Sequence, residues 1–145
     1  MKATGPKLVF IKAVCWLGIA ADALWTVGLL VPQVFGLLTG TPDFNPDLQT
    51  RLIMGVGGSL MAGWTLLLVW ALGDPIGRRG VLLLTAFPVV FGLFAVALTG
   101  FLNGDSGNIW ILVKTAAIFI AMLSGYLVAA RMDRALDNAT AESRP

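Results

Sequence analysis

Four long apolar runs, separated by short polar segments, dominate the chain. They cover about residues 8–38, 51–73, 81–102 and 109–130. Each run provides the roughly 20 helical residues that cross about 30 Å of hydrocarbon. The runs are continuously apolar instead of alternating, and a bilayer admits only helices or closed barrels, so we predict helices. The pattern predicts an all-α fold: a four-helix transmembrane bundle in a single membrane domain over 1–130, with a polar tail at 131–145 that begins as a short helical extension.

Polar residues between the runs predict where the helices begin. Asn45-Pro46 is typical of an N-cap followed by a first-turn proline, which would place Asp47 in the first turn of the second helix. Asp74-Pro75 repeats this pattern ahead of the third helix, and Asn108 is a candidate cap for the fourth. The outer loop at 39–50 is too short to form a domain, and it could either cap the bundle or contact a partner.

Two prolines lie inside the predicted helices, and each removes a backbone N–H donor. Pro32 lies close to the outer end of the first helix, where this loss costs little. Pro88 lies about two turns into the third helix, and we expect it to bend that helix.

The composition identifies the medium in which these helices fold. Hydrophobic residues make up 57% of the 145-residue chain and charged residues 12%, with a mean hydropathy of +0.85. Soluble domains average about 45–50% apolar and about 25% charged residues. So apolar a chain has too little polar surface to cover a water-soluble particle. The composition therefore predicts an integral membrane protein.

The same composition excludes several kinds of active site. The chain has no histidine, which excludes imidazole ligation of haem or zinc and any Ser-His or Cys-His catalytic pair within it. A single cysteine, Cys15, can form neither an intramolecular disulfide nor a CxxC centre, and its apolar neighbours favour a packing role. Phosphate-binding loops and nucleophile elbows are also missing from the sequence. We therefore predict no enzymatic activity and no cofactor.

The basic residues predict the orientation in the membrane. Eight of the ten lie on one side of the predicted spans: Lys2, Lys7, Lys12, Arg78, Arg79, Arg131, Arg134 and Arg144. The positive-inside rule then places both termini in the cytoplasm, and an even number of spans requires that they share one side. We expect a multi-pass protein of the bacterial inner (cytoplasmic) membrane whose first helix is retained and not cleaved as a signal peptide. Because the charges lie at span ends, the net charge of +2 does not indicate a nucleic-acid partner.

Small residues recur every four positions on two of the predicted helices. Gly55, Ser59 and Gly63 form such a stripe on the second helix, and Ala117, Ala121, Gly125 and Ala129 form one on the fourth. Stripes of this kind let helix backbones approach each other in lipid. Both stripes are therefore candidate packing faces, either between helices of one bundle or between this chain and a second protein.

Asp22 and Lys114 are the charged residues buried deepest in the predicted spans. Asp22 lies 15 residues beyond Lys7 and 10 beyond Lys12, roughly 15–22 Å from the cytoplasmic edge at 1.5 Å per residue. Lys114 lies 5 residues beyond Ile109, about 22 Å from the same edge, so the two depths overlap. A carboxylate at this depth costs about 2.5–3.5 kcal/mol and should face the protein interior.

Asp22 is therefore the main candidate site, with three competing interpretations. It could form a structural hydrogen bond or an ion pair with Lys114, it could bind a ligand or relay protons in a small transporter, or it could engage a partner subunit. Trp25, one turn further along, shares its helix face, and Trp64 also lies deep in the membrane. Either indole could wall a pocket around Asp22 or simply pack in the core. Lys114 could instead extend to the outer interface.

The stretch WTLLLVWALGDPIGRRGVLLLTAFPVV, residues 64–90, resembles small uncharacterised four-span bacterial inner-membrane proteins. The number and size of the spans are also loosely similar to the DoxX-like group. The resemblance implies a four-helix membrane fold and no particular activity. A carboxylate in the first of four helices is also similar to the plan of small multidrug resistance transporters, although this chain is longer, places its aspartate deeper and has none of their flanking aromatic motifs.

From the sequence we predict a non-catalytic accessory or assembly subunit of a larger membrane complex. Its partners would be membrane lipids and either another membrane protein or a second copy of itself. The alternative is a small dimeric transporter or channel that uses Asp22 for proton coupling or ligand binding, with Lys114, Trp25 and Trp64 around it.

Overall fold

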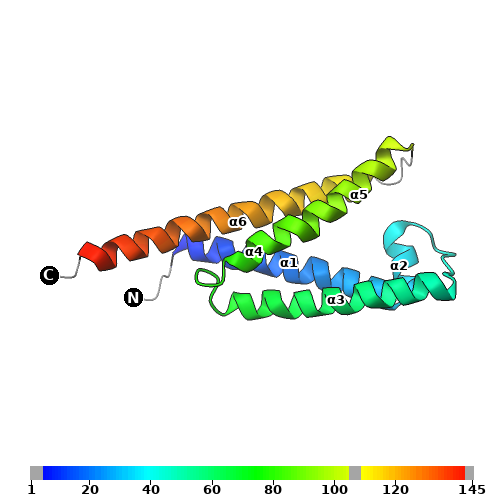
Figure 1. The fold of residues 1–145 in the computed structure, drawn as a ribbon, viewed down its shortest axis with the longest axis horizontal. Helices are drawn as coiled ribbons and strands as arrows, with labels where there is room; N and C mark the ends of the chain where they lie inside the picture. The colour runs from blue at the N-terminus through cyan, green and yellow to red at the C-terminus, as the bar shows by residue number, and fades with distance from the viewer. Residues whose placement is uncertain (1–4, 105–108, 143–145) are drawn as a thin grey trace. The chain divides into compact units, whose positions relative to one another are not determined.

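The computed structural model describes residues 5–104 and 109–142, and within these residues it contains helices and turns but no strand (Figure 1). Four helices are long and apolar enough to cross a membrane: Pro6–Leu30, Leu48–Leu72, Gly80–Leu102 and Ile109–Ala141. The predicted fold class, all-α with four long apolar helices, is therefore confirmed.

The first apolar run is divided into two helices. Helix α1 spans Pro6–Leu30 and helix α2 spans Pro32–Thr39, with Val31 extended between them at φ −122° and ψ 100°. The prediction of a single span over 8–38 is therefore wrong. The physical reason is that Pro32 has no N–H to donate to the carbonyl of Gly28, so the helix ends where this bond is lost.

The short helix α2 packs back against the last turns of α1. A Cβ atom added at Gly28 would lie 2.9 Å from Leu38 Cδ1, which shows how closely α2 approaches. Helix α2 ends at Gly40, whose φ of 77° is the left-handed conformation that glycine adopts without steric cost. The break at Pro32 therefore produces a corner, in which α2 turns back onto the end of α1, and not a mild bend.

Helix α3 spans Leu48–Leu72, and its cap differs from the one predicted. The Thr50 N–H donates to Asp47 Oδ1 at 2.8 Å, so Asp47 occupies the N-cap position that we assigned to Asn45. Hydrogen bonds from the side chain and the backbone of Thr50 hold the pKa of the Asp47 carboxyl below its ordinary value. Either residue type can cap a helix, and Asp47 lies at the correct spacing from the first free N–H groups.

The third span is broken into α4 (Gly80–Leu84), a π-helical turn η1 (Thr85–Val90) and α5 (Phe91–Leu102). Phe87 is extended at φ −110° and ψ 135°, directly before Pro88, so the predicted bend at Pro88 is confirmed. The predicted cap at Asp74 is wrong. Asp74 Oδ1 accepts the Gly77 N–H at 3.1 Å within a turn, and α4 begins only at Gly80.

Helix α6 spans Ile109–Glu142 and continues well past the predicted span end at residue 130, so the beginning of the polar tail is helical. The candidate cap Asn108 lies outside the described residues.

The chain forms two compact units, and the prediction of one domain over 1–130 stays a prediction. The first unit combines the start of α1, up to Cys15, with the chain from Ala71 onward. The second unit runs from Trp16 to Trp70 and contains the rest of α1, then α2 and most of α3. The core of the first unit brings α1, α4, η1 and α6 together through Ile11, Val14, Cys15, Leu82, Ala86, Met122 and Ala129. Cys15 is therefore a buried packing residue, as predicted.

Candidate functional site

Asp22 lies on α1, in the second unit, and only 8% of its surface is exposed. Among the described residues, its Oδ2 atom is buried and has no hydrogen-bond partner. Its backbone carbonyl accepts the Thr26 hydroxyl at 2.7 Å, so this neighbour bonds the main chain and not the carboxyl group. A buried carboxyl oxygen without a partner is costly, because it loses its hydration and gains no hydrogen bond in exchange.

Trp25 is half-buried and contacts α2. Its ring meets that of Phe35 edge-on at a centroid distance of 6.2 Å, and Phe35 in turn lies 4.9 Å from Phe44. The Phe44 contact thus holds the loop after α2 against that helix, and the choice between a capping role and a partner contact for this loop stays open. The sequence did not indicate Phe35, because a continuous first helix would have carried it away from Trp25.

Lys114 is exposed on α6 and belongs to the first unit, whereas Trp64 is half-buried on α3 in the second unit. The ion pair between Asp22 and Lys114 joins residues of different units and stays a prediction. Trp64 as a wall of the Asp22 site also stays a prediction.

The small-residue stripe on α6 is a packing face over half its length. Ala129 is fully buried, and a Cβ atom added at Gly125 would lie 3.0 Å from Val14 Cγ1 and 3.5 Å from Leu82 Cδ1. Ala121 is half-buried, and Ala117 at the other end is exposed. The stripe therefore brings α6 against α1 and α4 within the first unit.

The predicted stripe on α3 has few neighbours among the described residues of the second unit. Ser59 and Gly63 are exposed, and a Cβ atom added at Gly55 or Gly63 would have no described neighbour within 4 Å. The contact with α1 falls instead on Gly58, where an added Cβ atom would lie 2.8 Å from Leu30 Cδ2. Gly55, Ser59 and Gly63 therefore form a face that is open within the second unit, which we refer to as the open α3 face, and its use as a packing face stays a prediction.

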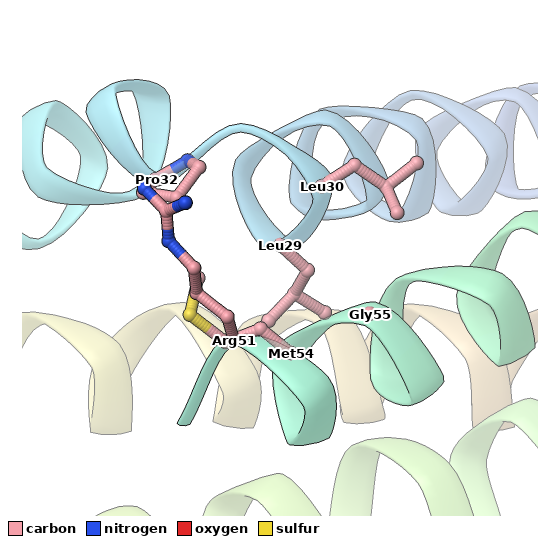
Figure 2. Close-up of a pocket in the computed structure, with 6 residues that line it drawn as sticks. All are labelled: Leu29, Leu30, Pro32, Arg51, Met54 and Gly55. Atoms are coloured by element: carbon pink, nitrogen blue, oxygen red, sulfur yellow. The ribbon is translucent and has the colours of Figure 1, made fainter. Parts of the chain in front are cut away.

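A groove of about 170 Å³ opens where α1 breaks and α3 begins, wholly within the second unit (Figure 2). It is lined by Leu29, Leu30, Pro32, Arg51, Met54 and Gly55, and we refer to it as the Arg51 groove. Figure 2 shows the Arg51 side chain extending from α3 toward Pro32 at the start of α2. Arg51 is one of the two basic residues outside the predicted cytoplasmic group of eight, and the groove was not predictable without the break at Pro32.

The first unit contains an ion pair near the end of its core. Arg79 Nη2 lies 2.8 Å from Asp133 Oδ2, and the two side chains are 31% and 30% exposed. Arg79 also donates to the Ile76 carbonyl at 3.1 Å. It therefore links the turn before α4 to Asp133 on α6. No group of three or more acidic or cysteine side chains among the described residues could hold a metal ion.

No family model, curated protein or solved structure matches the chain. The resemblance of residues 64–90 to four-span inner-membrane proteins, and the looser one to the DoxX-like group, stay predictions.

Proposed function

We propose that this integral membrane protein is a non-catalytic accessory or assembly subunit that packs its open α3 face against another membrane protein. The observation that carries the proposal is that Gly55, Ser59 and Gly63 have the spacing of a packing stripe, while a Cβ atom added at Gly55 or Gly63 meets no described neighbour within 4 Å. In lipid, helices gain little from burying apolar surface, so close approach along small residues supplies much of their attraction. A stripe used internally, such as the one around Gly125, is covered by its neighbours.

The proposal includes a location in the bacterial inner membrane with both termini in the cytoplasm. It is supported by the positions of the basic residues and by four apolar helices, an even number of crossings. In this orientation the ion pair between Arg79 and Asp133 faces the cytoplasm, and Arg51 lies at the outer boundary.

The test is purification of the tagged protein from its native membrane in mild detergent, followed by mass spectrometry. We expect a stoichiometric membrane partner that is lost from Gly63→Leu, since the larger side chain blocks close approach. The matched control is Gly92→Leu on α5, where an added Cβ atom also has no described neighbour within 4 Å. A partner that remains bound to Gly63→Leu, or a monomer with no partner, would contradict the proposal.

A second candidate function is supported by Asp22. An aspartate that is only 8% exposed, with one buried carboxyl oxygen unpartnered among the described residues, is poised to take up a proton or a ligand group. This candidate is a small dimeric transporter or channel in which Asp22 is the coupling residue. It predicts a dimer of this chain alone in the same purification.

Proton uptake by Asp22 has a direct spectroscopic test. On acidification, the infrared spectrum of the reconstituted protein should gain the C=O band of a protonated carboxyl group, and Asp22→Asn should lack it. Asp43→Asn is the control, because Asp43 is exposed. An identical set of bands in wild type and Asp22→Asn would exclude this second candidate and leave the subunit proposal unaffected.

A further inference from the structure

The Arg51 groove combines apolar walls with one cationic side chain. Leu29 and Leu30 come from the last turn of α1, and Met54 and Gly55 from the second turn of α3. Gly55 leaves the wall open, since a Cβ atom added there would have no described neighbour within 4 Å. Figure 2 shows the guanidinium group of Arg51 at the end of the groove nearest Pro32.

The Arg51 guanidinium has no partner in the described part of the chain. The nearest carboxylate in the sequence, Asp47, lies one turn earlier on the chain and instead accepts the N–H of Thr50. No hydrogen bond joins Arg51 to the carbonyl groups at the end of α1 among the described residues. The groove therefore presents an uncompensated positive charge.

The start of α2 lies at one end of this groove. Its N-cap residue, Val31, makes no side-chain cap, and the Val31 carbonyl accepts the N–H groups of both Val34 and Phe35. The first turn of a helix carries a partial positive charge, which favours a nearby anion. Pro32 both opens α2 and lines the groove, so the N-terminal end of α2 lies at the groove together with Arg51.

The position and size of the groove select the kind of anion. Helix α1 ends at Leu30 and α3 begins at Leu48, so the groove lies at the end of two membrane spans, where lipid headgroups are found. Its volume of about 170 Å³ is below the roughly 300–1,000 Å³ of sites that enclose a whole small molecule. It suits a headgroup phosphate and the first carbons of a chain whose remainder stays in the bilayer.

We propose that the Arg51 groove binds an anionic phospholipid, with the phosphate on Arg51 and the first acyl-chain carbons along Leu29 and Met54. The guanidinium fork matches two phosphate oxygens, and charge-assisted hydrogen bonds of this kind are the strong ones. The apolar walls supply the specificity for a lipid over a free anion. The bound lipid fills the corner between α1, α2 and α3 and stabilises it.

Native mass spectrometry of the detergent-solubilised full chain, titrated with dioleoyl phosphatidylglycerol or dioleoyl phosphatidylcholine, tests this proposal. Both lipids carry a phosphate and the same chains, but only the first has a net negative charge. We expect phosphatidylglycerol to bind about tenfold more tightly, because the choline cation of phosphatidylcholine competes with Arg51 for the phosphate and is repelled by it. Arg51→Gln should remove this preference, whereas Arg131→Gln, a change at an exposed basic residue of α6, should retain it.

A second pair of variants tests the groove without altering its charge. Gly55→Leu should fill the groove and weaken the binding of both lipids, whereas Gly63→Leu on the open part of α3 should not. Equal affinity for the two lipids, or an unchanged preference in Arg51→Gln, would overturn the proposal. The Tm measured with inorganic phosphate and with phosphatidylglycerol gives a third comparison. An equal rise in Tm with both would also overturn the proposal, because the site would then bind a free anion.

Discussion

Gly125 provides the sharpest test of the packing described for the first unit. A Cβ atom added there would lie 3.0 Å from Val14 Cγ1 and 3.5 Å from Leu82 Cδ1. Val14 and Leu82 are only 5% and 1% exposed, so neither can swing into open space. Val14 is also β-branched and has one strongly preferred side-chain rotamer in a helix. A larger side chain at Gly125 must therefore move a helix.

The expected cost of Gly125→Leu follows from this geometry. Forcing extra methylene groups into a filled core costs about 1–3 kcal/mol. Replacing glycine in a helix also gains about 0.8–1.0 kcal/mol of helix propensity, which would hide part of that cost. Gly63→Leu receives the same gain without the overlap, because nothing described lies within 4 Å of its added Cβ atom. The difference between the two variants therefore isolates the overpacking cost.

The assay is thermal unfolding of both variants in the same detergent, monitored by circular dichroism. For a chain of this length, each kcal/mol corresponds to about 4 °C, so the Tm of Gly125→Leu should lie about 4–12 °C below that of Gly63→Leu. Gly125→Ala adds a single carbon and should fall between them. Equal Tm values for the two leucine variants would refute the close contact of α6 with α1 and α4.

Three further predictions concern charged groups. Asp47→Ala should lower the Tm by removing the α3 cap. The pKa of Asp47 is lower in the folded than in the unfolded protein, so the cap stabilises the fold fully above the unfolded pKa near 4. This stabilisation is lost as the pH falls through the folded pKa. Asp47→Asn should keep the Tm at neutral pH but not show the loss in acid. A double-mutant cycle on Arg79 and Asp133 should give a coupling of about 0.2–1 kcal/mol that shrinks in high salt, and a salt-independent value would contradict a partly exposed ion pair. If Asp22 pairs with Lys114, Asp22→Asn and Lys114→Gln should each lower the Tm in detergent and the double variant should recover part of the loss, whereas full stability of both single variants would exclude the pair.

The spans were predictable because their signal is local. A continuous apolar run of about 20 residues has few alternatives in a bilayer, and Asp22 could be identified as unusual from the cost of its charge alone. The corner at Pro32 was not predictable in the same way. Proline ends a helix wherever its missing N–H is not compensated, but the direction of the chain afterwards depends on contacts such as that of Trp25 with Phe35. Those contacts join residues that a straight helix would separate.

The stripe on α3 shows why spacing alone could not identify the packing face. The helix contains glycine at 55, 57, 58 and 63, so small residues are available on more than one side. Spacing of four selects Gly55, Ser59 and Gly63, yet α1 lies against Gly58. Which face of α3 is used depends on where α1 runs before it ends at Pro32, and that is a property of the tertiary structure. The pattern shows that α3 can be approached closely, and only the structure shows from which side.

The two units differ in how many of their buried polar groups, charges and small-residue faces have partners within the unit. In the first unit the small residues around Gly125 are covered, and Arg79 is paired with Asp133. The second unit contains the buried Asp22 oxygen, the open α3 face and the cation of the Arg51 groove, none of which has a partner among the described residues of that unit. Proteins depart from local consistency mainly where function requires it. Substitutions that impair function without lowering stability should therefore concentrate between Trp16 and Trp70, and those that lower stability should concentrate in the core of the first unit.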